Sequence, residues 1–179
     1  MTSSISHLPA TASTDRSRGE AAATYAGSHP LRLLARGLGA IALVAVGVVH
    51  LQQYSSDYYR VVPVIGTLFL LNFIGAVGLA IVLLAPTGAI VDRLVGRGGP
   101  LVVALAAAGA VALAASSFVF LLISERTMLF GFHEYGYRTA VVVALVTEPA
   151  SSVLLLGYLA GAWRARRADH GTASTAATP

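Results

Sequence analysis

Residues 139–163 read TAVVVALVTEPASSVLLLGYLAGAW, and this stretch decides the fold. It is long enough to cross the hydrocarbon core of a bilayer, which takes about 20 residues at roughly 1.5 Å each. Its single charged residue, Glu148, lies near the middle, where a carboxylate has no water. Such a residue must be neutral, partnered, or beside a polar cavity. Glu148 is therefore the first candidate for a functional residue.

Three further apolar runs have a similar length: residues 33–52, 61–85 and 101–123. They are continuous and rich in Ala, Leu and Gly, whereas the strands of a membrane barrel alternate over about ten residues. The chain has 56% hydrophobic and 11% charged residues, with a mean hydropathy of +0.74. These features predict an all-α membrane protein, an up-down-up-down bundle of four transmembrane helices. We expect one transmembrane domain over residues 31–167.

The two ends of the chain, residues 1–30 and 168–179, are dominated by small and polar residues. They have too little apolar surface to offset the entropy of ordering, so they are predicted to be disordered tails. A cleaved signal peptide is the alternative for the first run, but VVHLQQ lacks a small-x-small cleavage site. The absence of cysteine excludes disulfides and thiolate metal sites.

All twelve basic residues are arginines, and their placement predicts the orientation. Cytoplasmic loops of membrane proteins are enriched in Lys and Arg. Nine arginines fall on one side of the predicted spans and three on the other, so both termini and the middle loop should be cytoplasmic. The nine are Arg16, Arg18, Arg32, Arg36, Arg93, Arg97, Arg164, Arg166 and Arg167; the three are Arg60, Arg126 and Arg138. The net charge of +4 is thus an orientation signal, and no nucleic-acid partner is expected.

Proline and glycine mark the limits of the second helix. Pro63 suits a first helical position, where its missing amide hydrogen costs nothing, and the turn sequence at residues 86–88 should end the helix. Residues 89–100 are predicted to contain a short helical turn at the cytoplasmic interface of the membrane. Gly96, Gly98, Gly99 and Pro100 should end this turn.

Small residues predict where helices pack closely. In the third helix they recur every four residues, at Ala104, Ala108, Ala112 and Ser116. Two other helices have shorter sets, Ala76 with Ala80 and Gly157 with Gly161. These residues are expected to close the bundle, and a homodimer face is the alternative.

Asn72 and Glu148 are predicted to lie at similar depths, roughly 14 to 18 Å from the outer ends of their helices. They can therefore meet, and an amide can bond either form of a carboxyl group. Pro149 frees a main-chain carbonyl beside the acid. One interpretation is a kinked helix whose Glu only ties two helices together. The other is a protonatable residue that lines a small cavity.

Polar and aromatic residues gather at the predicted outer face, where aromatic side chains form a belt in many membrane proteins. His50, His133 and Glu134 could bind a metal or haem there, because imidazole and carboxylate are competent ligands. The two histidines lack any close spacing such as HxxxH. Interfacial hydrogen bonding is therefore the preferred interpretation, and the cofactor stays unknown.

Several of these segments together resemble a group of actinobacterial four-span membrane proteins. The matching segments are Val49-His50-Leu51, VPVIGTLFLLN at residues 62–72, FGFHE at residues 130–134, and Glu148. In that group the pattern is H-L, then I-P-T-I-G-x-L-F-L-L-N/Q, then L-F-G-F-x-E, then a Glu in the last helix. Val64 departs from it, since Thr is usual there. The resemblance implies no reaction, but it groups His50, Asn72, Glu134 and Glu148 as one set of ligand- or proton-binding residues.

Two classes of function follow. The first is a non-enzymatic scaffold or accessory subunit, as a homodimer or in a larger membrane complex. The alternative is a carrier or binding site for a proton-coupled or lipid-like ligand, such as a quinone, centred on Glu148. Metal or haem binding at the outer face is third. An enzyme has least support, because the sequence contains no phosphate loop, HExxH or GxSxG motif.

Overall fold

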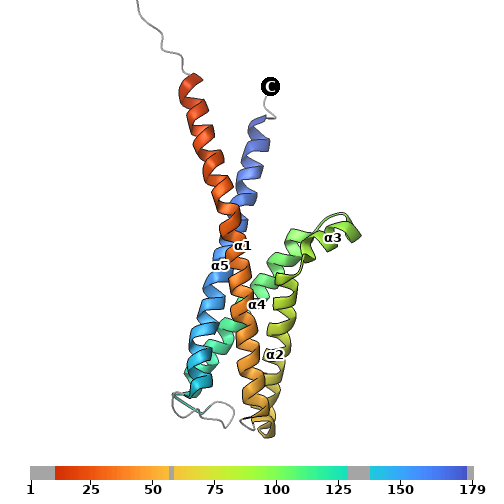
Figure 1. Ribbon diagram of the computed structural model, residues 1–179, viewed down its shortest axis with the longest axis vertical. Coiled ribbons are helices and arrows are strands. Elements are labelled where there is room, and N and C mark those ends of the chain that lie inside the picture. Colours follow the sequence, from red (N-terminus) through yellow and green to blue (C-terminus); the bar gives the residue numbers. More distant parts are fainter. Residues whose placement is uncertain (1–10, 57–58, 129–137, 177–179) are drawn as a thin grey trace, which may run out of the picture.

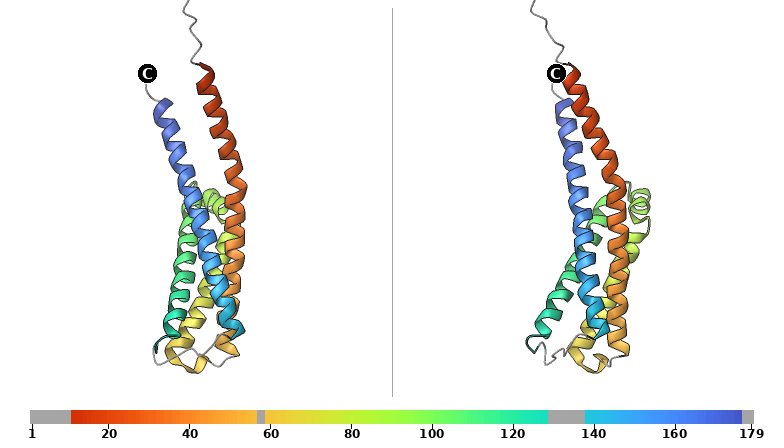
Figure 2. Two further views of the ribbon diagram at one scale, coloured as in Figure 1. Left: turned by 90° about the vertical axis from the view of Figure 1, so that its left-hand side faces the viewer. Right: turned by 60° about the vertical axis from the view of Figure 1, so that its left-hand side comes forward.

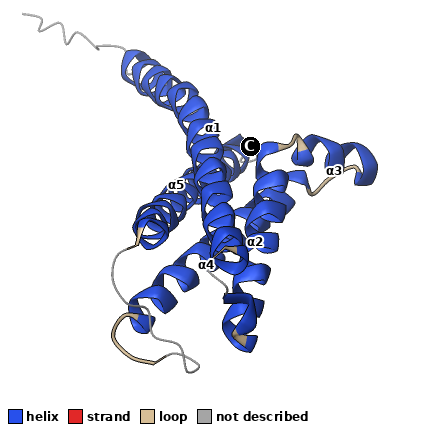
Figure 3. Cartoon of the chain, turned by 60° about the horizontal axis from the view of Figure 1, so that its bottom comes forward, coloured by secondary structure: helices blue, strands red, loops and turns tan. Residues whose placement is uncertain are grey.

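The computed structural model describes residues 11–56, 59–128 and 138–176, with side chains over 29–56, 59–128 and 138–169. Within these ranges the chain is helical, without strands (Figure 3). The elements are α1 (Thr11–Ser55), η1 (Tyr59–Val61), α2 (Pro63–Leu84), α3 (Thr87–Val95), α4 (Gly99–Ser124) and α5 (Thr139–Ala176). The predicted all-α class is confirmed.

Among the described residues, four helices have the length and composition to cross a membrane: His29–Ser55 of α1, α2, α4, and Thr139–Asp169 of α5. The protein is therefore a multi-pass membrane protein with four spans, as predicted. Helix α1 packs against α2 and α5, and α4 packs against the same two helices. Neighbours in this ring run in opposite directions (Figures 1 and 2). The up-down-up-down order is confirmed.

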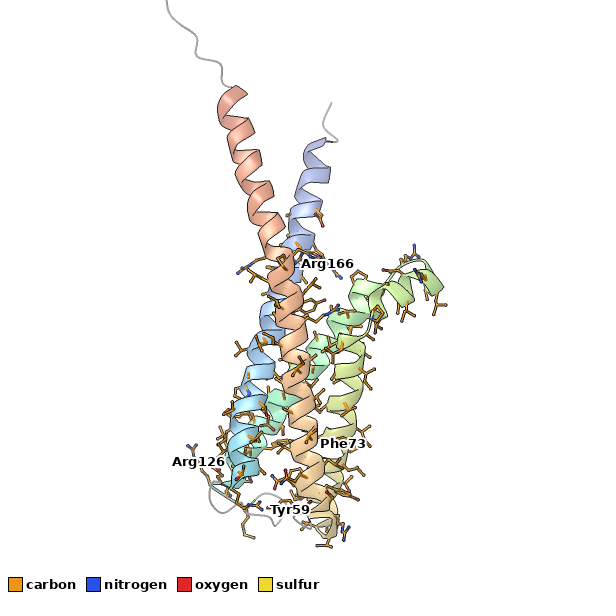
Figure 4. The ribbon with its side chains drawn as sticks, viewed as in Figure 1. Tyr59, Phe73, Arg126 and Arg166 are labelled. Carbon is orange, nitrogen blue, oxygen red and sulfur yellow. The ribbon has the colours of Figure 1, made fainter. Side chains whose placement is uncertain are left out.

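The two ends of the bundle differ in what they carry. The N-terminal part of α1, the C-terminal part of α5 and α3 lie at one end, while η1 lies at the other (Figure 1). Arg166 and Arg126 mark these opposite ends in Figure 4. We call them the termini end and the η1 end. Nine of the twelve arginines belong to segments at the termini end and three to segments at the η1 end, which is the division that the sequence predicted.

The backbone of the two tails differs from expectation. Helix α1 is already helical at Thr11, and α5 continues to Ala176, although residues 11–30 and 168–176 were expected to be disordered. The prediction weighed only the burial of apolar surface. It neglected that an existing helix extends at little cost once nucleated, especially through alanine-rich sequence such as residues 20–26. Residues 1–10 and 177–179 lie outside the described residues.

The predicted start of the second helix holds, whereas the short helix begins at Thr87, before the expected residue 89, and Gly99 and Pro100 already belong to α4. Pro63 is the first residue of α2, whose cap residue Val62 has extended backbone. The short helix α3 follows and ends at Gly96, which has a φ of 77°. Ile90, Leu94 and Val95 of α3 are all exposed, as expected for a helix that presents an apolar face to its surroundings.

The packed core lies towards the termini end and is built from small residues. Its buried members come from all four spans: Ala40 and Leu43 (α1), Ala76, Ala80 and Leu83 (α2), Val103, Ala106, Ala107, Ala110 and Ala114 (α4), and Leu155 (α5). Two glycines of α1 allow close helix approach. A side chain at Gly39 would press on Leu155, and one at Gly47 would press on Ala76 and Val77.

The predicted small-residue stripe of α4 does not close the bundle. Ala108, Ala112 and Ser116 are exposed, and the alanines that pack inside belong to the neighbouring face of the helix. Alanine occupies both faces of α4, so a spacing of four residues did not distinguish the inner face. Ala76 and Ala80 of α2 are buried, as predicted, and Gly161 lies against the side chain of Arg32.

Candidate functional site

Glu148 is buried inside the bundle. Its side chain is 1% exposed, and α5 places it nine residues after Thr139, about 14 Å into the helix. The helix continues through Pro149 without interruption. The hydroxyl of Ser152 donates to the main-chain carbonyl of Glu148 at 2.9 Å. This bond supports the backbone next to the proline.

Three side chains from three helices form a connected polar cluster. The Oγ atom of Ser117 on α4 lies 2.7 Å from Oε1 of Glu148 and 3.0 Å from Nε2 of His50 on α1. On the other side of the ring, Nδ1 of His50 donates to the carbonyl of Val46 at 2.9 Å. His50 is 6% exposed and packs edge-on against Phe69, with ring centroids 5.3 Å apart. We call Glu148, Ser117 and His50 the polar triad.

A cavity of about 220 Å³ adjoins the triad at the η1 end of the bundle. Its walls are the last turns of α1 and α4 and the first turns of α2 and α5. Most lining side chains are apolar, among them Ile65, Phe69, Leu113 and Leu121, and the polar ones include His50, Asn72, Ser117 and Glu148. A dry cavity of about 150 Å³ already holds benzene, so this one has room for a larger ring.

The cavity opens sideways between α2 and α4. Leu71 on α2 and Phe120 on α4 both line it and are 58% and 45% exposed. The two helices touch nearer the termini end, where Gly75 faces Leu113 and Gly109 faces Leu79. Towards the η1 end the cavity separates them. The opening therefore faces the membrane interior.

Two buried acceptor atoms at this cavity have no hydrogen-bond partner: Oε2 of Glu148 and Oδ1 of Asn72. A buried polar atom without a partner costs about 1–3 kcal/mol, so native proteins rarely leave two together. Both residues line the same cavity. A ligand that donates hydrogen bonds would satisfy them.

Arg138 links several elements at the η1 end of the bundle. Its guanidinium donates to Oε1 of Gln53 at 3.2 Å and also to the hydroxyl of Tyr59. Tyr59 in turn packs against Phe69, with ring centroids 5.2 Å apart. These contacts connect the residue that precedes α5 to α1 and η1.

The structure brings together three of the four residues predicted as one set. His50, Asn72 and Glu148 line one cavity, whereas Glu134 lies outside the described residues. The expected bond between Asn72 and Glu148 is absent, because the carboxyl group turns towards Ser117. Depth along a helix fixes how far a residue lies in the membrane but not which way its side chain points.

Ser117 was missed by the sequence analysis. A single serine in an apolar helix commonly bonds its own backbone, as Ser116 does to Leu113, so it gives little signal. The metal or haem site predicted from His50, His133 and Glu134 falls partly on residues 129–137, which are not described. Among the described residues no three potential metal ligands come together.

Comparisons of the chain with protein-family models, with curated proteins and with solved structures each found no match. The functional argument therefore depends on the cavity and the polar triad.

Proposed function

We propose that this protein binds a small lipid-soluble molecule whose polar end donates hydrogen bonds. The observation that supports this most is the pair of unpartnered acceptors, Glu148 Oε2 and Asn72 Oδ1, at an otherwise apolar cavity. Such a site suits an amphipathic ring compound, because apolar walls provide most of the contact and a few polar groups fix its orientation. The quinone-like ligand expected from the sequence belongs to this class in its reduced, hydroxyl-bearing form.

The proposal is tested with a matched pair of probes, 4-fluoro-1-naphthol and its methyl ether. Fluorine NMR of the protein in lipid nanodiscs separates bound probe from probe dissolved in lipid. We expect the naphthol to bind at least about fivefold more tightly than the ether, since a hydrogen bond to a buried acceptor is worth about 1–3 kcal/mol. Equal affinities, or no bound signal beyond that of empty nanodiscs, would contradict the proposal.

Filling the mouth of the cavity should weaken naphthol binding. Ser116 lines the cavity and is exposed, so the ring of Ser116→Phe is expected to occupy the opening and lower affinity about tenfold or more. Ala112→Phe is the matched control. Ala112 is one turn away, also exposed, and does not line the cavity. Equal loss in both variants would place the binding elsewhere.

A second candidate is the scaffold or accessory subunit. It is supported by the outward position of Ala108, Ala112 and Ser116 on α4, a smooth surface that another helix could approach closely. A homodimer or a larger membrane complex would then cover this face. Crosslinking from Ala108→Cys in native membranes tests it, and a chain that stays monomeric and uncrosslinked contradicts it.

We also propose that the protein resides in a bacterial plasma membrane with both termini in the cytoplasm. The nine arginines at the termini end, against three at the η1 end, support this orientation. The sequence resemblance to actinobacterial four-span membrane proteins supports a bacterial source. The cavity would then open into the outer leaflet.

A further inference from the structure

The hydrogen on the His50 ring is fixed by its main-chain partner. Nδ1 lies 2.9 Å from the carbonyl oxygen of Val46, and a carbonyl oxygen can only accept. Nδ1 must therefore carry a hydrogen. In a neutral imidazole the other nitrogen, Nε2, is then a bare acceptor that faces Ser117.

Ser117 has one hydroxyl hydrogen for two neighbours. It can donate to Nε2 of His50 or to Oε1 of Glu148, but not to both. The neighbour that does not receive this hydrogen must itself donate to Oγ. Otherwise two lone pairs would face each other at 2.7 or 3.0 Å.

With one titratable proton shared between Glu148 and Nε2 of His50, two arrangements satisfy these bonds. In the first, a protonated Glu148 donates to Ser117, and Ser117 donates to a neutral His50. In the second, a protonated Nε2 of His50 donates to Ser117, and Ser117 donates to a carboxylate. Both arrangements hold the same number of protons, and they differ only in where one proton resides.

We infer that the polar triad is a proton relay, which passes a single proton between Glu148 at the cavity and His50 on α1. In the forward step the O–H bond at Oε1 breaks and its proton moves to Oγ of Ser117. The original hydroxyl proton of Ser117 moves to Nε2 of His50. Serine is unchanged, a carboxylate and an imidazolium remain, and the total charge stays zero.

The distances suit this transfer. Nε2 and Oε1 lie 3.9 Å apart, too far for a direct hydrogen bond, and Ser117 bridges them within hydrogen-bond distance of both. Among the residues that line the cavity, only His50 and Glu148 can titrate near neutral pH. At the η1 end, Arg138 donates to Gln53, which also lines the cavity, and to Tyr59. The triad therefore exchanges its proton internally or with a ligand.

The uncharged arrangement is the resting one, because separating charge in apolar surroundings is costly. It leaves Oε2 of Glu148 as a bare carbonyl acceptor next to the cavity, consistent with its missing partner. Here the inference rests on the proposed function, since the ligand's donor is what would meet Oε2. A stronger donor there favours the carboxylate and so moves the proton towards His50.

The proton count is tested first without any ligand. Nitrogen-15 NMR of histidine-labelled protein in nanodiscs reports the tautomer and charge of His50, with His50→Gln to assign the signal. Infrared spectroscopy reports the acid carbonyl of Glu148, with Glu148→Gln to assign it. We expect a protonated Glu148 and a neutral His50 with its hydrogen on Nδ1. Two protons or none in the triad at neutral pH, or a neutral His50 with hydrogen on Nε2, overturns the relay.

The transfer is tested with 4-fluoro-1-naphthol bound. We expect the acid carbonyl signal of Glu148 to fall and the imidazolium signal of His50 to rise by equal amounts. The methyl ether should change neither signal. Ser117→Ala should abolish at least nine-tenths of the His50 response, and Ser117→Thr, which keeps the hydroxyl, should restore it. An unchanged His50 response in Ser117→Ala contradicts the relay. Bound naphthol without any His50 response also contradicts it, while leaving the binding function intact.

Discussion

Glu148→Leu is expected to lower the affinity of the cavity for 4-fluoro-1-naphthol about 10- to 100-fold. Leucine has a similar size but no acceptor, so it removes one bond to the ligand, worth about 1–3 kcal/mol at a buried site. The fold should persist, because Ser117 can still donate to Nε2 of His50, 3.0 Å away. Fluorine NMR titration in nanodiscs measures the affinity.

Glu148→Gln tests whether the ligand needs only a hydrogen-bond acceptor at this position or an ionisable acid. The amide keeps a carbonyl for the ligand and an N–H group for Ser117, so we expect naphthol affinity within about threefold of the parent. Glu125→Leu is the matched control, since Glu125 also has a buried unpartnered oxygen but does not line the cavity. If Glu148→Gln lowered naphthol affinity as much as Glu148→Leu, the ligand would be bound by a carboxylate and not by an uncharged acid.

Gly99→Ala is expected to destabilise the fold by about 2–3 kcal/mol, the usual cost of forcing extra atoms into a tightly packed site. A Cβ at Gly99 would overlap the carbonyl oxygen of Gly88 and lie 2.6 Å from Oδ2 of Asp92. Both neighbours belong to α3. The amide of Gly99 also donates to Oδ1 of Asp92 at 2.8 Å, which fixes the start of α4 against α3.

Equilibrium unfolding in mixed micelles, followed by the fluorescence of the single tryptophan, measures this loss. Gly78→Ala is the control, because a Cβ there meets no atom within 4 Å. In a helix interior that change should be neutral or stabilise by up to about 1 kcal/mol. Gly99 lies at the termini end, so folded Gly99→Ala protein should bind naphthol normally. Equal stability of the two variants would show that α3 does not pack against Gly99 in the membrane.

The spans and their limits could be predicted from the sequence because they depend on local chemistry. Hydrocarbon demands long apolar runs, Pro63 suits a first helical turn, and the glycines after α3 end it. The start of α1 at Thr11 was missed because helix extension depends on the neighbouring helical residues, not on burial alone.

The sequence predicted how deep in the membrane the site residues lie, but not which way their side chains point. Glu148 and Asn72 were placed at one level by counting residues, and they do line one cavity. Which way each side chain turns depends on helix rotation and on how far α2 and α4 separate, and both are tertiary properties. The same limit explains why Ser117 was missed and why the exposed face of α4 was taken for its inner face.

The separation of α2 and α4 at only one end of the bundle has a consequence for which compounds could reach the cavity under the proposed binding function. Close contact at Gly75 and Gly109 seals the half of the membrane nearer the chain termini, while the gap between Leu71 and Phe120 leaves the other half open. Compounds confined to the sealed monolayer must first flip across the bilayer before they reach Glu148. Occupancy of the cavity should therefore follow the composition of one monolayer. The same compound would then give different occupancy when it is added to one monolayer of a vesicle or to the other.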